Sequence, residues 1–266
     1  MFAGDFFGPA DVPLPVVATG RRAGGAALRA RDCAVVGAGH TAVHCTSPAG
    51  VGAGYSWTLS VAGRSSAPSA QTTSYGPPSL AAVVVSGPGT AGGDEVGTVP
   101  TAGGATVTVS GANFGADTTA LVVTWGGAVV PVVSLTQPHT TLSFTSPPGQ
   151  GAGADVTVTV DGQPAARVVR VPFAAPRVTA LRLIDNAAPL SCTTVGDDGR
   201  PVGRPGGTAV LVIRGVNFGQ GDATTVTIRD VPCALRGPVD DSEVVCQTEL
   251  CTGTKVGGHC MHACAT

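Results

Sequence analysis

The sequence predicts an all-β fold in which antiparallel β-sandwiches follow one another along the chain, and three observations predict it. The 266 residues are 43% hydrophobic but only 12% charged, and 39 glycines and 21 prolines provide turns. Apolar and polar residues alternate with period two in segments such as VTVTVDG at 156–162. One long pattern also recurs after about 100 residues, which is the length of a single sandwich.

The repeated pattern sets the expected domain organisation. GGATVTVSGANFGADTTALVVTWGG at 103–127 can be laid over GGTAVLVIRGVNFGQGDATTVTIRD at 206–230, and Phe7-Gly8 begins an incomplete copy. Repeats of this length are whole domains rather than turns of a solenoid. We therefore expect four segments, joined by linkers with prolines: a partial domain lacking its first strands at 1–76, a complete domain at 77–174, a C-terminally irregular or truncated domain at 175–250, and a Cys/His-containing tail at 251–266.

Within the middle copy, runs of five to seven residues between turn signals are expected to be strands. No helical interlude separates them, as an antiparallel sandwich requires. The expected strands are Ala82–Ser86, Thr106–Ser110, Leu121–Trp125, Val129–Leu135, Thr140–Thr145, Asp155–Val160 and Ala166–Val171.

Charge and hydropathy exclude several partners. The net charge of −2 leaves no basic surface suited to nucleic acid, and no nucleic-acid partner is expected. One basic cluster, Arg21, Arg22, Arg29 and Arg31, is either an anion site or a solvated, mobile segment. No apolar run reaches the roughly 18 residues of a membrane-spanning helix, so no membrane span is expected in this chain.

The stretch AVVGAGHTAVHC at 34–45 resembles the glycine fingerprint of a dinucleotide-binding turn. That turn needs a helix directly after it, so that the helix N-terminus faces the pyrophosphate. Here Ser47-Pro48 and several glycines follow instead. We therefore interpret Gly37 and Gly39 as residues of a turn between two strands, and expect no cofactor.

The combined motifs resemble the IPT/TIG domain. These motifs are the Gly-Gly turn, the alternating strand, Gly-x-Asn-Phe-Gly and Ser-Pro-x-Gly-x-Gly. The resemblance implies an immunoglobulin-like fold, as in plexins, hepatocyte-growth-factor-type receptors, fibrocystin-like proteins and Rel-type transcription factors. Phe6 replaces the Asn in the first copy, and the third copy departs from the pattern after Cys246. We expect a fold-maintaining role for the motif residues Asn113, Phe114, Gly115, Asn217, Phe218 and Gly219.

Four of the eight cysteines occupy matching places in two copies. Cys33 and Cys45 lie in the first copy, and Cys233 and Cys246 lie in the third, whereas the middle copy lacks both members. Joint presence or absence predicts a disulfide within each pair, and stable disulfides favour an extracellular location. The alternative is two free, buried cysteines that act as small hydrophobic residues.

The remaining cysteines allow three interpretations: further disulfides, a disordered tail, or a metal site. Cys192 is isolated, whereas Cys251, Cys260 and Cys264 lie near His259 and His262. Their spacing matches none of the usual zinc sites, so Cys251, His259, Cys260 and Cys264 are weak candidates for metal ligands.

No catalytic motif is present in the sequence, and we expect no enzymatic activity. His40 and His139 occupy equivalent positions, but Asp241 replaces them in the third copy, which favours a turn-forming or exposed strand-edge position over a catalytic role. The resemblance implies a binding or spacer segment at the cell surface or outside the cell, with a protein or glycan partner. The alternatives are an intracellular transcription factor and accessory domains of a carbohydrate-active enzyme.

Overall fold

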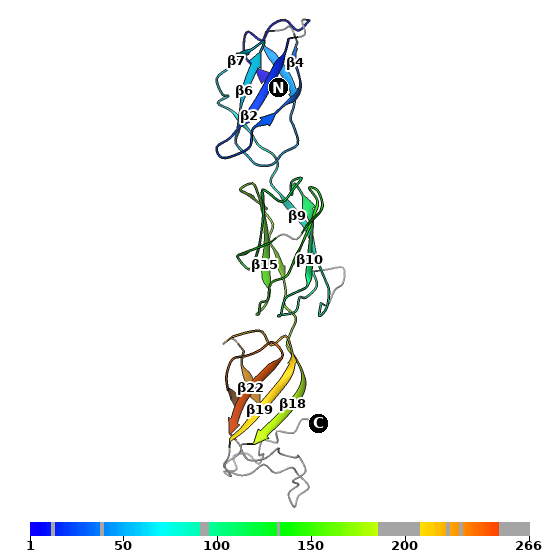
Figure 1. The fold of residues 1–266 in the computed structure, drawn as a ribbon, viewed down its shortest axis with the longest axis vertical. Coiled ribbons are helices and arrows are strands. Elements are labelled where there is room, and N and C mark those ends of the chain that lie inside the picture. Colours follow the sequence, from blue (N-terminus) through cyan, green and yellow to red (C-terminus); the bar gives the residue numbers. More distant parts are fainter. Residues whose placement is uncertain are drawn as a thin grey trace, which may run out of the picture. The chain divides into compact units, whose positions relative to one another are not determined.

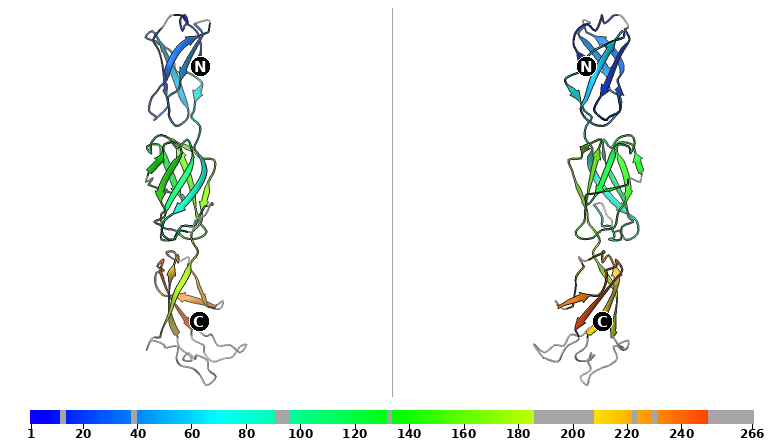
Figure 2. Two further views of the ribbon diagram at one scale, coloured as in Figure 1. Left: turned by 90° about the vertical axis from the view of Figure 1, so that its right-hand side faces the viewer. Right: turned by 60° about the vertical axis from the view of Figure 1, so that its left-hand side comes forward.

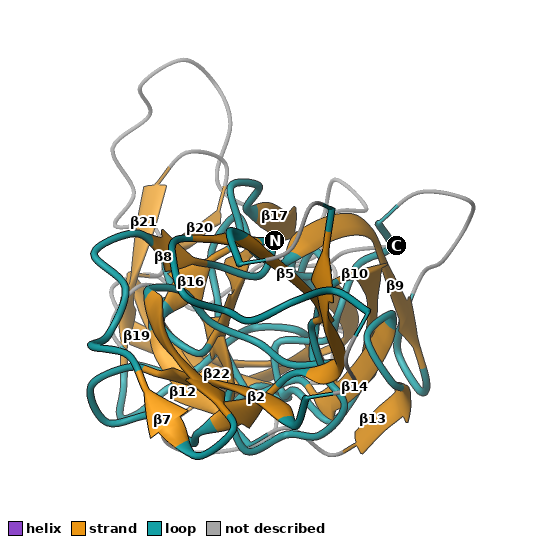
Figure 3. Ribbon diagram, turned by 90° about the horizontal axis from the view of Figure 1, so that it is seen from above, coloured by secondary structure: helices purple, strands orange, loops and turns teal. Residues whose placement is uncertain are grey.

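The fold is described from a computed structural model, which describes residues 1–11, 14–37, 40–90, 96–131, 134–185, 208–221, 224–228 and 231–249. These residues form strands, turns and loops, and none of them is in a helix (Figure 3). Accordingly, no helix in this part of the chain has the length and apolar character needed to cross a membrane.

The chain divides into two compact units, each made of several segments. The first unit comprises Met1–Val83, Thr108–Phe144 and Asp155–Val169. The second comprises Val84–Val107, Thr145–Ala154 and the described residues from Arg170 onward. These units do not follow the repeats seen in the sequence, so the boundaries at 76, 174 and 250 stay a prediction.

The strands nearest the N-terminus form two antiparallel sheets within the first unit (blue to cyan in Figure 1). One has the order β1-β5-β4, and the other has the order β3-β2-β6-β7 with β8 also paired to β6. The bounds are β1 (Phe2–Ala3), β2 (Val16–Arg21), β3 (Leu28–Arg29), β4 (Arg31–Val36), β5 (Ala42–Thr46), β6 (Tyr55–Val61), β7 (Arg64–Ser65) and β8 (Thr72–Thr73).

Side chains from both sheets form one hydrophobic core. Tyr55, Trp57 and Leu59 alternate along β6 and are buried, as the period-two pattern of a strand requires. Trp57 and Leu59 pack in a cluster with Val43 from the facing sheet. Gly37 has a φ of 73° directly after β4, whereas Gly39 lies outside the described residues. The next element is the strand β5 rather than the helix that a nucleotide fingerprint needs.

The middle strands form a further pair of sheets (green in Figure 2). Their orders are β13-β14-β10-β9 and β12-β11-β15-β16, with β17 also paired to β15. The bounds are β9 (Ser79–Ser86), β10 (Thr106–Ala112), β11 (Leu121–Trp125), β12 (Ala128–Val130), β13 (Ser134–Gln137), β14 (Thr141–Thr145), β15 (Ala154–Val160), β16 (Gln163–Pro164) and β17 (Val169–Val171).

The prediction of one strand at Val129–Leu135 is wrong, because that segment contributes to two strands in different sheets. β12 pairs with β11, whereas β13 pairs with β14. Pro131 lies between them and has no N–H to continue a ladder, so the chain leaves one sheet there. The two sheets meet in the first unit through Trp125 and Phe144, whose ring centroids lie 6.0 Å apart.

The last described strands form a five-stranded antiparallel sheet in the second unit, and Figure 1 shows its members β18, β19 and β22 side by side. The order is β18-β19-β22-β21-β20. A core of Leu211, Ile213, Val244 and the cysteines Cys233 and Cys246 lies against it. The bounds are β18 (Arg177–Asp185), β19 (Thr208–Val216), β20 (Val226–Ile228), β21 (Val231–Leu235) and β22 (Glu243–Glu249).

Candidate functional site

The Asn-Phe-Gly motif of the middle strands forms a tight corner directly after β10. Asn113 has a φ of 64° and Gly115 a φ of 89°, both in the left-handed region that Asn and Gly adopt most readily. The Asn113 Nδ2 donates a hydrogen bond of 3.0 Å to the main-chain oxygen of Pro77. Phe114 is fully buried between these two residues. The corner therefore ties the linker before β9 to the core of the sandwich.

The second corner, after β19, has the same geometry. Asn217 has a φ of 63°, and its Nδ2 donates 3.3 Å to the main-chain oxygen of Ala175. Gly219 has a φ of 77°, and Phe218 packs against the core of the last sheet. In both places the Asn side chain binds the segment that leads into the neighbouring strand, β9 in the first case and β18 in the second. This role is structural.

A polar cluster in the second unit surrounds Asn217. The Asn217 Oδ1 accepts 3.3 Å from the main-chain N–H of Thr101, whose hydroxyl donates to the Asp241 carboxylate. Asp241 Oδ1 also accepts 3.0 Å from the N–H of Gly219. Gln220 donates its N–H over 2.8 Å to the side chain of Gln150. Each of these polar atoms has a partner within the protein, so the cluster stabilises the structure rather than presenting free groups to a ligand.

His40, His139 and Asp241 hold equivalent turn positions. Phe7, Phe114 and Phe218 donate their N–H groups to the main-chain oxygens of these three residues over 3.0–3.1 Å. The φ angles of His40 and His139 are 65° and 66°, which identifies both as turn residues. The histidines therefore shape the corner through their backbone.

A charged pair that the sequence did not predict lies in the first unit. Arg22, directly after β2, forms an ion pair with Asp161, and about a fifth of each side chain is exposed. The Arg22 Nε donates 3.2 Å to the Tyr55 hydroxyl, and its guanidinium carbon lies 5.4 Å from the Tyr55 ring centroid. The hydrogen bond to Asp161 raises the pKa of Arg22 above its ordinary value. Arg22 is therefore a paired, structured residue rather than part of a mobile basic segment.

Two tyrosines continue this network. The rings of Tyr55 and Tyr75 meet edge to face at 6.1 Å, and their hydroxyls donate to the main-chain oxygens of Val51 and Pro48 over 2.9 and 2.7 Å. Burial raises the pKa of Tyr75. Gln163 donates 3.1 Å to the main-chain oxygen of Tyr75.

A small cavity lies beside Tyr75, with Val51, Asn113, His139 and Gln163 in its wall. Its volume is about 60 Å³. Sites for drug-sized ligands measure roughly 300–1,000 Å³, so this cavity has room for a few water molecules and not for a substrate or a cofactor.

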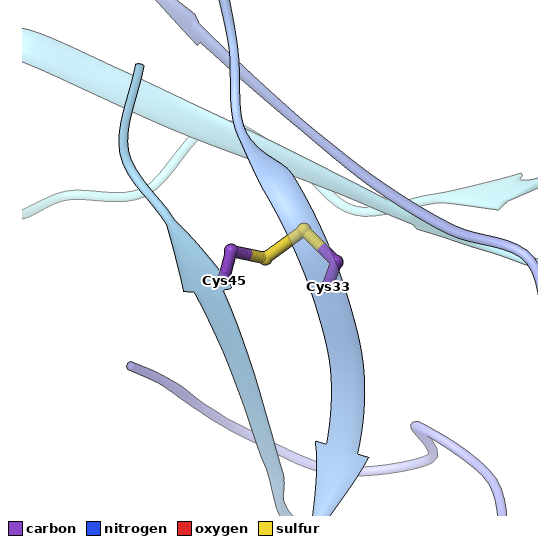
Figure 4. Close-up of a disulfide and its surroundings, with 2 residues drawn as sticks. All are labelled: Cys33 and Cys45. Carbon is purple, nitrogen blue, oxygen red and sulfur yellow. A yellow bond between two sulfur atoms is a disulfide. The ribbon is translucent and has the colours of Figure 1, made fainter. Parts of the chain in front are cut away.

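Each predicted cysteine pair is joined by a disulfide. Cys33 of β4 and Cys45 of β5 are bonded across neighbouring strands, as Figure 4 shows. Cys233 of β21 and Cys246 of β22 are joined in the same way. The second disulfide is buried in the core of its sheet, whereas the first is partly exposed.

The weak metal candidates Cys251, His259, Cys260 and Cys264 lie outside the described residues, as does Cys192. Within the residues that the structure does describe, no group of three or more His, Cys, Asp or Glu side chains could hold a metal ion. The features found in the described residues are therefore the corners, the polar cluster around Asn217, the Arg22–Asp161 ion pair and the disulfides, and all of them are structural.

Comparison with family models assigns the domains that contain these corners to a family. The model of the IPT/TIG domain matches residues 97–170 and 200–257, which contain the two Asn-Phe-Gly corners. The chain contains tandem IPT/TIG domains. Its immunoglobulin-like β-sandwich fold, expected from the resemblance, is thereby confirmed. A comparison with curated proteins found no match.

Solved structures similar to these IPT/TIG domains include two of the plexin A4 extracellular region. They are 15% and 12% identical, cover 84% and 89% of this chain, and both have a TM-score of 0.30. SGBP-B from a complex xyloglucan utilization locus in Bacteroides uniformis is 17% identical over 89% of this chain, with a TM-score of 0.29. The chain spans 17% and 28% of the two plexin chains and 60% of the SGBP-B chain. At such TM-scores, the family assignment rests on the two matched segments alone.

Proposed function

We propose that this chain is a non-catalytic binding and spacer segment of tandem IPT/TIG domains that works at the cell surface or outside the cell and engages a protein or glycan partner. The family supports the general role, because IPT/TIG domains are generally binding or spacer domains. The identity of the partner does not follow from the fold.

The observation that carries the proposal is the pair of disulfides. Cys33–Cys45 and Cys233–Cys246 each join neighbouring strands. Disulfides of this kind persist in oxidising compartments and are rare in the reducing cytosol. They therefore favour the extracellular role over that of an intracellular transcription factor.

The chemistry of the described residues supports a non-catalytic role. Arg22, which contacts Tyr55, is neutralised by Asp161. The cavity itself, about 60 Å³, is too small for a substrate. Recognition would therefore use loops and sheet faces rather than a pocket, and we expect no cofactor and no nucleic-acid partner.

Peptide mapping without reduction tests the location. The natively purified full chain is alkylated, digested and analysed by mass spectrometry. We expect disulfide-linked peptides for Cys33 with Cys45 and for Cys233 with Cys246. If both pairs are recovered as free alkylated thiols, the extracellular proposal is wrong and the transcription-factor alternative takes its place. If both disulfides are found, binding to a glycan array would separate a glycan partner from a protein partner.

A further inference from the structure

The structure separates the arginines of the basic cluster, Arg21, Arg22, Arg29 and Arg31. Arg22 is in the ion pair with Asp161, and Arg31 begins β4 of the facing sheet. Arg21 and Arg29 are exposed, and neither forms an ion pair with any residue that the structure describes. Their charges are therefore not compensated within the described part of the protein.

Strand register places Arg21 and Arg29 on one face of the sheet formed by β2, β3, β6, β7 and β8 (Figure 1). Arg29 of β3 lies opposite Thr19 of β2, and Arg21 follows Thr19 two residues later. Alternate residues of a strand point to the same side, and diagonal neighbours on adjacent strands lie about 7–8 Å apart. The two guanidinium groups can therefore contact one extended ligand.

This face is the outer one, and hydroxyl groups surround the arginines on it. Ala18 and Gly20, which alternate with the outer residues along β2, are buried on the opposite side. The residues that β6 and β8 place across from the outer residues of β2 carry hydroxyl groups. We call six side chains the arginine–hydroxyl face: Thr19, Arg21, Arg29, Ser56, Thr58 and Thr72.

The arginine–hydroxyl face contains no carboxylate and no aromatic ring. None of the described strands of its sheet contains an Asp or a Glu. The aromatic side chains of β6, Tyr55 and Trp57, are buried on the inner face. With no ring available for stacking and no negative charge, recognition on this face depends on the arginine charges and on hydrogen bonds.

The strand β15 provides an internal comparison, because it is equivalent to β6. Each strand ends in a turn whose two residues both have a positive φ, 47° and 81° at Ala62-Gly63 and 51° and 78° at Asp161-Gly162. Counting back from these turns, Ser56 corresponds to Asp155. The equivalent sheet therefore carries a carboxylate where the arginine–hydroxyl face carries a hydroxyl.

The place of Arg29 also differs between the two sheets. Val129 lies opposite Thr124 as Arg29 lies opposite Thr19, and the two threonines are equivalent by the same count. Val129 is 71% exposed, so the position faces solvent in both sheets. The positive face is therefore specific to the strands nearest the N-terminus and is not a requirement of the fold.

We propose that the arginine–hydroxyl face binds an acidic polysaccharide, whose sulfate or carboxylate groups pair with Arg21 and Arg29 and whose hydroxyl groups bond the serine and threonines beside them. The planar guanidinium group matches both kinds of anion. A protein partner is typically anchored by large side chains in desolvated pockets, which these six polar side chains do not form. The inference rests on the proposed function and deepens it by naming the chemical class of a glycan partner.

Titration of the full chain with acidic polymers tests this proposal. Calorimetry compares dextran sulfate and polygalacturonate with neutral dextran of the same length. We expect saturable binding of at least one acidic polymer, weakening as salt is added, and no binding of neutral dextran. The two acidic polymers distinguish sulfate from carboxylate as the source of the charge.

Substitution of single arginines locates the site. Arg21→Gln and Arg29→Gln should each weaken binding about threefold, as expected for the loss of one exposed charge pair. Arg64→Gln is the matched control, because Arg64 is exposed in the same sheet but lies opposite Val61, which packs against the core on the inner side. It removes the same charge and should leave the affinity unchanged. Unchanged hydrogen exchange in β6 shows that each variant is folded.

A second pair of variants tests the sign of the charge. Ser56→Asp places a carboxylate opposite Arg21, as Asp155 does in the equivalent sheet. The new carboxylate should pair with that guanidinium and repel an anionic ligand, so binding should weaken more than in Arg21→Gln. Ser56→Asn adds a side chain of nearly the same size without charge and should weaken binding less than Ser56→Asp.

Three results would overturn the proposal. One is the absence of saturable binding by both acidic polymers, and another is an equal loss of affinity in Arg64→Gln and Arg29→Gln. The third is equal or tighter binding of polyglutamate or duplex DNA that also depends on Arg29, which would assign the face to an acidic protein or a nucleic acid. None of these results alters the mapping of the disulfides, so failure of this proposal is distinguishable from failure of the extracellular one.

Discussion

Truncating Phe114 tests whether the Asn-Phe-Gly corner maintains the fold. The side chain is fully buried behind the corner that Asn113 and Gly115 form. Replacing a buried Phe by Ala costs about 3–5 kcal/mol, because apolar contacts are lost and a cavity remains. For a sandwich of about 100 residues, 1 kcal/mol corresponds to roughly 4 °C or more in Tm, so Phe114→Ala should lower the transition of that sandwich by at least roughly 12–20 °C.

The assay must report on that sandwich alone, because a chain of several domains does not unfold in one step. Hydrogen exchange of amides in β10 and β15, measured against denaturant, gives a local free energy of opening. Phe6→Ala is the matched control: Phe6 stands at the equivalent of the Asn position and is 94% exposed, so its loss should change stability by less than about 0.5 kcal/mol. A loss below about 1 kcal/mol for Phe114→Ala would refute the assignment of this ring to the core.

Three further measurements address other parts of the chain. Asn217→Ala should lower the free energy of unfolding by about 2 kcal/mol, because it removes the hydrogen bonds to Ala175 and Thr101 and places Ala at a positive φ. Asn217→Gly removes the same hydrogen bonds but tolerates the positive φ, so it should lower the free energy by less. Equal losses for the two variants would contradict the role of backbone strain. On titration with a reductant followed by alkylation, the partly exposed Cys33–Cys45 should open before the buried Cys233–Cys246, and the reverse order would be inconsistent with control by access. Burial raises the pKa of Tyr75. The contribution of Tyr75 to stability should therefore be complete below the ordinary tyrosine pKa of about 10 and be lost as the pH rises through the higher pKa of the folded state. Unfolding curves measured against pH should show this loss in the parent chain and not in Tyr75→Phe.

The sequence predicted those features that depend on neighbours in the chain. Alternation along 156–160 identified β15, and the glycines and asparagines marked corners that need a positive φ. The cysteine pairs were found by comparing copies, because Cys33 and Cys45 are both replaced in the middle one. Each of these signals lies within one hairpin or one motif.

The features that were missed depend on residues far apart in the sequence. Arg22 and Asp161 are separated by 139 positions, and Asp161-Gly162 reads as an ordinary turn. The bond between Thr101 and Asp241 spans 140 positions in the same way. The crossing from β12 to β13 was missed because apolar residues continue on both sides of Pro131, and only the sheets themselves reveal which partner each half has.

The position of each disulfide within a single hairpin bears on how the protein is made. The two cysteines of each pair are 12 and 13 residues apart. Short loops close in well under a microsecond, long before a domain of about 100 residues has been synthesised. Each bond can therefore form as soon as its own hairpin emerges during synthesis. In that order of events, Cys33 and Cys45 meet before any later thiol of the chain has been synthesised, whereas Cys192 is already present when Cys233 and Cys246 emerge.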